Sequence, residues 1–151
     1  MPTFAAERRF RRTGLSVSAL VIVLLFAGLA VAGTPVESIR LTATPGAHVS
    51  ASAVIHERGA GTQVRIAIRG LEPRGSVRAI VRAGSCARPS ASFASVGAGK
   101  VANDGTAHLR AAVLFHGTQP VAWSVVTGGD HTIALVAEGR MAACGAIPPA
   151  Q

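Results

Sequence analysis

Short stretches in which apolar and polar residues alternate recur along most of this chain of 151 residues, and they strongly restrict its fold. In residues 62–70, for example, Val64, Ile66 and Ile68 occupy every second position. A two-residue period places the apolar side chains on one face of a β-strand. We predict strands over residues 38–43, 49–56, 62–70, 76–83, 106–113, 121–127, 132–137 and 141–147.

Turn-forming residues separate these stretches at intervals of about 8–12 residues, which is typical of antiparallel sandwiches and barrels. The turn segments are 44–46, 57–61, 71–75, 103–105 and 128–130, and residues 84–92 are expected to form a loop. Residues 93–102 are ambiguous because Gly97 and Gly99 weaken a strand. Aromatic residues make up only 4%, with no Tyr, so we expect a core of small aliphatic side chains around Trp123 and no helix.

The first 32 residues have the composition of a leader. Several arginines precede an uncharged apolar run, residues 15–32, which ends in Ala30-Val31-Ala32. These features predict a secretory signal peptide cleaved after Ala32. The run is also long enough to span a bilayer, so an uncleaved signal anchor is the alternative. Either way, residues 33–151 are expected to form a single exported, extracytoplasmic domain.

The chain contains two cysteines, Cys86 and Cys144. In an exported domain we expect them to form one disulfide, and two buried free thiols are the alternative. A disulfide between them would close a loop of about 58 residues and stabilise the fold by on the order of 4 kcal/mol in the chain-entropy model.

The formal net charge of +8 indicates a general attraction to anionic surfaces. Outward positions of two successive predicted strands carry four arginines: Arg65, Arg69, Arg78 and Arg82. If those strands are neighbours, the four guanidinium groups form one face able to bind carboxylates or phosphates. The alternative is four separately solvated arginines. Nucleic acid binding is not expected, because no aromatic residues interleave with the basic ones.

Four motifs together resemble the copper/zinc superoxide dismutases, and more specifically small exported bacterial relatives of that family. They are Gly70-Leu-x-Pro-x-Gly75, Ala83-Gly-Ser-Cys-Ala87, Asp104-Gly105 and Ala143-Cys-Gly-Ala-Ile147. The similarity covers roughly residues 38–147. It implies an antiparallel Greek-key β-sandwich in which a disulfide joins Cys86 to Cys144.

The chain departs from this family at the metal ligands. The resemblance implies histidines at two positions before the first cysteine, where this chain has Ile80 and Arg82, and a further one in residues 133–137, which contain none. The family's substrate-guiding arginine would fall at Met141, with Arg140 next to it. Without these ligands, we expect no metal, no cofactor and no dismutase activity.

The histidines that the chain does have are His48, His56, His108, His116 and His131, and no two show metal-ligand spacing. No sequence signature of a Ser/His/Asp triad is present either. We therefore expect a non-catalytic, superoxide dismutase-like module of the cell envelope, with a binding or structural role and anionic envelope components as partners. The alternative is a degenerate copper- or zinc-binding protein, or a residual superoxide dismutase, in which separate histidines converge.

Overall fold

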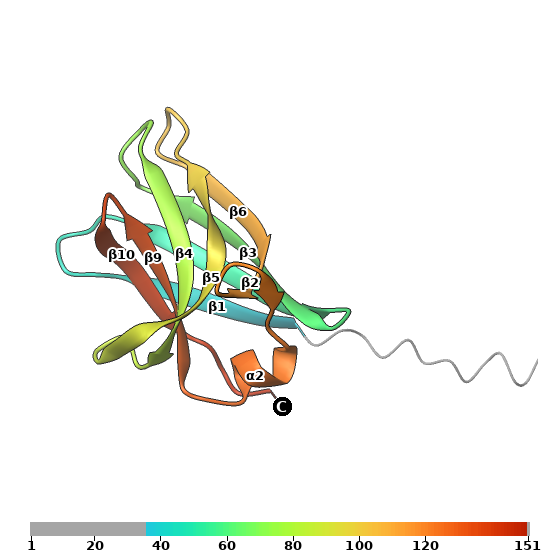
Figure 1. Ribbon diagram of the computed structural model, residues 1–151. Helices are drawn as coiled ribbons and strands as arrows, with labels where there is room; N and C mark the ends of the chain where they lie inside the picture. The colour runs from blue at the N-terminus through green and yellow to red at the C-terminus, as the bar shows by residue number, and fades with distance from the viewer. Residues whose placement is uncertain (1–35, 151) are drawn as a thin grey trace, which may run out of the picture. The chain divides into compact units, whose positions relative to one another are not determined.

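The computed structural model describes residues 36–150, whose regular secondary structure is almost entirely β-strand (Figure 1). The strands are β1 (Val36–Ala43), β2 (Ser50–Arg58), β3 (Gly61–Arg69), β4 (Ser76–Gly84), β5 (Pro89–Lys100), β6 (Ala107–Ala112), β7 (Leu114–Phe115), β8 (Gln119–Pro120), β9 (His131–Ala137) and β10 (Arg140–Ala146). One short helix, α2 (Trp123–Thr127), interrupts them. The all-β prediction is confirmed. The predicted leader, including the apolar run 15–32, lies outside the described residues.

Among residues 36–150, none of the helices is both long enough and apolar enough to span a bilayer.

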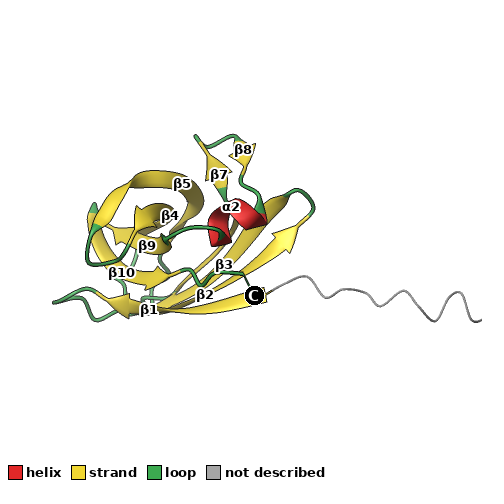
Figure 2. Ribbon diagram, turned by 90° about the horizontal axis from the view of Figure 1, so that it is seen from below, coloured by secondary structure: helices red, strands yellow, loops and turns green. Residues whose placement is uncertain are grey.

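All the strands belong to one antiparallel sheet with the order β6-β3-β2-β1-β10-β9-β4-β5-β7-β8. The four-stranded half (β6-β3-β2-β1) and the six-stranded half (β10-β9-β4-β5-β7-β8) join where β1 pairs with β10, at Thr42↔Cys144 and Ala43↔Ala143. The sheet curls over, so the two halves enclose the core between them (Figure 2).

At the other side of the curl, β5 packs beside β6 without pairing with it, so the sheet is nearly closed. Glycines allow this close approach. A Cβ atom added at Gly99 would lie 2.7 Å from Cδ2 of Leu109, and one at Gly97 would lie 3.1 Å from Cβ of Ala111. The glycines that made residues 93–102 ambiguous in sequence are therefore part of a strand, β5, at a place where two backbones meet.

The inward residues of the two halves form one core. The alternation predicted for residues 62–70 is confirmed, because Val64, Ile66 and Ile68 are all buried. Ile133 and Leu135 on β9 meet them from the six-stranded half. Trp123 belongs to this core as predicted, although the element that carries it is not a strand.

The prediction of a strand over residues 121–127, and of no helix, is wrong. Residues Trp123–Thr127 form helix α2, in which the Thr127 hydroxyl donates a hydrogen bond to the carbonyl of Trp123. Trp123, Val126 and Thr127 are buried, whereas Val125 is 48% exposed. This three- and four-residue spacing is that of a helix face. A segment of only five residues is too short for a helical period to be distinguished in the sequence from the two-residue period of a strand.

The predicted loop over residues 84–92 is shorter than expected. Strand β5 begins at Pro89, which stands opposite Gly84, so the β4–β5 connection is a hairpin over residues 85–88. Polar contacts hold its base: Arg82 donates from Nε and Nη2 to the Ser90 carbonyl at 2.9 and 2.6 Å, and the Ser90 hydroxyl donates to the Ala83 carbonyl at 2.8 Å. Residue propensities alone did not indicate these contacts across the base of the hairpin.

The disulfide predicted between Cys86 and Cys144 is present. It ties the tip of the β4–β5 hairpin to β10, the strand that joins the two halves of the sheet. This covalent link is consistent with folding in an oxidising, extracytoplasmic compartment.

Candidate anion-binding face

The four arginines predicted to form one face are divided by the sheet order. Strand β3, which carries Arg65 and Arg69, pairs with β2 and β6 in the four-stranded half. Strand β4, which carries Arg78 and Arg82, pairs with β5 and β9 in the six-stranded half. The condition set by the sequence, that the two strands are neighbours, is not met.

A different set of basic residues meets on the outer surface of the four-stranded half. The register places Arg65 opposite Val54 on one side and directly opposite Arg110 on the other. It also places Arg40 in the same row as Ser52, Ala67 and His108. We call this surface the basic face. Its outward residues are Ser38, Arg40, Thr42, Ser50, Ser52, Val54, His56, Arg58, Gln63, Arg65, Ala67, Arg69, His108, Arg110 and Ala112.

The ionisable side chains that the basic face presents are all basic. Its outward positions hold five arginines and two histidines, and no Asp or Glu stands among them. At one end, Arg58 Nη1 donates to Gln63 Oε1 at 3.3 Å, and His56 Nε2 lies 3.2 Å from the same oxygen. Because no carboxylate is interleaved, the cationic side chains reinforce one another's field over four adjacent strands.

One carboxylate stands at the border of this face, in the turn that follows β5. The Thr106 hydroxyl and the Thr106 backbone N–H donate to Asp104 at 2.7 and 3.0 Å. These two hydrogen bonds are the main reason why the pKa of Asp104 lies below 3.8, and the positive charge of Arg69 contributes in the same direction. Asp104 is therefore ionised and is engaged with its own turn.

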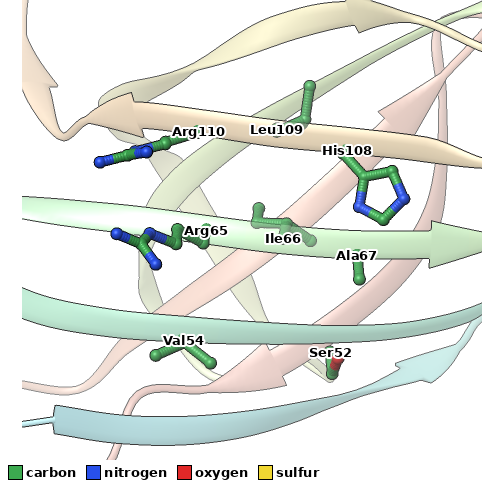
Figure 3. Close-up of a pocket in the computed structure, with 8 residues that line it drawn as sticks. All are labelled: Ser52, Val54, Arg65, Ile66, Ala67, His108, Leu109 and Arg110. Atoms are coloured by element: carbon green, nitrogen blue, oxygen red, sulfur yellow. The ribbon is translucent and has the colours of Figure 1, made fainter.

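The basic face has two adjoining hollows. The first has a volume of about 270 Å³ and is lined by Ser52, Val54, Arg65, Ile66, Ala67, His108, Leu109 and Arg110. In Figure 3 the side chains of Arg65 and Arg110 run side by side toward one end of this hollow, and His108 stands at the other end. The second, of about 440 Å³, includes Arg40 and Arg69 and shares Ser52 and Ala67 with the first. The depression arises because these two short side chains lie between long ones.

Sequence reasoning missed Arg40 and Arg110 as members of the same basic face as Arg65. Both occupy outward positions of strands that alternate in sequence, which was a detectable signal. What the sequence did not reveal is that β6 pairs with β3, so that Arg110 comes to lie opposite Arg65.

The histidines are dispersed over the described part of the chain. His56 and His108 lie on the basic face, and His48 and His116 are exposed in connections. His131 begins β9, and its ring centroid lies 4.8 Å from that of Phe93, with the two rings tilted. Within residues 36–150, no group of three or more His, Cys, Asp or Glu residues is close enough to hold a metal ion. The arginines of the basic face offer charge-assisted hydrogen bonds to anions.

No protein-family model, no curated protein and no solved structure matches this chain. The relation to the copper/zinc superoxide dismutases stays a prediction from the sequence motifs.

Proposed function

We propose that the exported domain is a non-catalytic binding module that attaches to anionic polymers of the cell envelope through the basic face. One observation carries this proposal: five arginines and two histidines share four adjacent strands, with no carboxylate among their outward positions. A guanidinium group forms forked, charge-assisted hydrogen bonds to phosphate or carboxylate oxygens. A surface with several of them attracts a polyanion at long range and holds it at short range.

The proposal includes a distant relation to the copper/zinc superoxide dismutases, with the Greek-key sandwich that this implies. The sheet order supports it. After the β4–β5 hairpin has crossed to the six-stranded half, β6 returns to pair with β3, and a strand that returns beside an earlier one is the mark of a Greek key. The disulfide between the two cysteines of the resembling motifs is further support.

The absence of catalysis is proposed from the residues that replace the family's ligands. Ile80 has no atom that can ligate a metal, and Arg82 is cationic and already donates twice to the Ser90 carbonyl. The competing proposal is a degenerate copper- or zinc-binding protein. Elemental analysis of the protein isolated from an exporting cell separates the two, because stoichiometric copper or zinc would overturn the non-metal proposal.

Retention on an immobilised anionic polymer tests the binding function. A variant with Arg40, Arg65, Arg69 and Arg110 changed to Gln loses four charges from the basic face. A control with Arg78, Arg88, Lys100 and Arg140 changed to Gln loses the same charge from exposed positions outside it. We expect the first variant to elute at a clearly lower salt concentration than the control. Elution of both at the same salt concentration would show that only net charge matters, and would refute the proposal.

A further inference from the structure

Arg65 and Arg110 are register partners on β3 and β6, and both are exposed. Directly opposed side chains on paired strands have Cβ atoms only about 5 Å apart, where like charges destabilise the pair. Figure 3 shows the two side chains running in parallel toward the same end of the first hollow. An anion placed between the two guanidinium groups would turn this repulsion into two attractions.

We propose that Arg65 and Arg110 form a discrete site for the phosphoryl group of a phosphate monoester, whose carbon portion lies along the hollow toward His108. This inference rests on the proposed function, because it names the chemical group that the basic face prefers. A monoester at neutral pH carries a charge of nearly −2, which matches the two guanidinium charges.

Geometry favours a phosphoryl group over a carboxylate. Two guanidinium forks on neighbouring strands offer more N–H donors than the two oxygens of one carboxylate can accept in good geometry. A terminal phosphoryl group has three such oxygens and can receive both forks at once.

The rest of the hollow indicates an ester and not a free ion. Val54 lies in the same row as the two arginines, and the neighbouring row toward the other end of the hollow is formed by Ser52, Ala67 and His108 (Figure 3). Ala67 lies directly between Ser52 and His108 in the register, so its short side chain leaves room above it. A small planar or apolar group fits this floor, and His108 can stack on it.

The test is calorimetric titration of the isolated protein with phenyl phosphate, inorganic phosphate and benzoate. We expect phenyl phosphate to bind most tightly and benzoate to bind least tightly. Arg65→Gln and Arg110→Gln should each weaken phenyl phosphate binding about tenfold, as expected for loss of a charged hydrogen-bonding partner. Ala67→Leu should fill the floor, weakening phenyl phosphate binding while sparing inorganic phosphate. Equal binding of benzoate and phenyl phosphate would overturn the phosphoryl preference.

Two control variants distinguish a discrete phosphoryl site from a general attraction of anions to the positive charge of the protein. Arg69→Gln removes a charge from the same face but from outside the first hollow, and Arg78→Gln removes one from the other half of the sheet. Both should bind phenyl phosphate within about twofold of the unaltered protein. Equal weakening by all four arginine variants would refute the site and leave the polymer-binding function standing. Unchanged polymer retention together with a specific effect of Arg65 and Arg110 would refute the proposed function and leave the site.

Discussion

Cys86 and Cys144 are 58 residues apart in the sequence, yet their disulfide holds their Cα atoms 5.8 Å apart. The bridge lies beside the seam of the sheet, because Cys144 is also the residue of β10 that pairs with Thr42 of β1. Only two register pairs join β1 to β10. The covalent link therefore reinforces the short hydrogen-bonded connection through which β1 joins the two halves of the sheet.

Replacing both cysteines by Ala is expected to destabilise the protein by on the order of 4 kcal/mol, because the open chain regains the entropy that a 58-residue loop had lost. Denaturant unfolding monitored by circular dichroism measures this change. Reducing the unaltered protein should produce a loss of similar size. An unfolding midpoint that does not move on reduction would contradict the prediction.

Two glycines with nearly the same backbone conformation should respond differently to Ala. Gly46 has a φ of +83° and nothing within 4 Å of an added Cβ, whereas Gly70 has a φ of +82° and an added Cβ would collide with the His48 carbonyl oxygen. Gly46→Ala should cost about 1 kcal/mol, the penalty of a left-handed conformation. Gly70→Ala should cost at least about 2 kcal/mol more, because the backbone must shift. Equal losses of unfolding free energy would show that the collision is absent.

Helix α2 predicts which of two neighbouring valines contributes more to the unfolding free energy. A strand over the same residues would predict the opposite order. Val126 is completely buried and Val125 is 48% exposed. Val126→Ala should therefore cost about 2 kcal/mol in unfolding free energy, whereas Val125→Ala should change it by less than about 0.5 kcal/mol. In a strand, Val125 would share the inward face with Trp123 and the order of the two effects would be inverted. Thermal or chemical unfolding of the two variants distinguishes the elements.

Local patterns predicted much of this fold. The alternation of Val64, Ile66 and Ile68 identified a buried face correctly, and Asn103-Asp-Gly105 identified the turn after β5. The two cysteines predicted their own pairing. The alternation and the turn are each encoded by a few neighbouring residues. Two cysteines allow only one pairing within the chain, so their number alone identifies the partners.

The pairing of distant strands could not be obtained in this way. The sequence suggested that Arg65 meets Arg78, because their strands follow each other along the chain, but the chain crosses to the other half of the sheet between them. Arg65 meets Arg110 instead. Alternation states which residues face outward, whereas the choice of neighbouring strand depends on how the whole core closes. The candidate site therefore required the register, although each of its residues was visible in the sequence.

The lowered pKa of Asp104 predicts an acid-dependent contribution to stability. A carboxyl group with a folded-state pKa below its unfolded value of 3.8 stabilises the fold above that value, and this stabilisation is lost as the pH falls through the folded pKa. Asp104→Asn can still accept hydrogen bonds from Thr106 but cannot titrate. At about pH 6 the variant should melt at a lower temperature than the unaltered protein, and the gap should narrow below about pH 4. A gap that is the same at both pH values would exclude this linkage.

The repulsion between the opposed side chains of Arg65 and Arg110 should lower the unfolding free energy, while their two positive charges favour anion binding. Arg110→Glu replaces a repulsive cross-strand pair by an attractive one, so we expect the unfolding free energy to rise by about 0.5 kcal/mol at low salt. Arg110→Gln removes the repulsion alone and should give a smaller gain. Both gains should shrink as added salt screens the charges, and both variants should bind phenyl phosphate poorly. If Arg110→Glu unfolds more easily than Arg110→Gln at low salt, the two side chains do not interact as their register indicates.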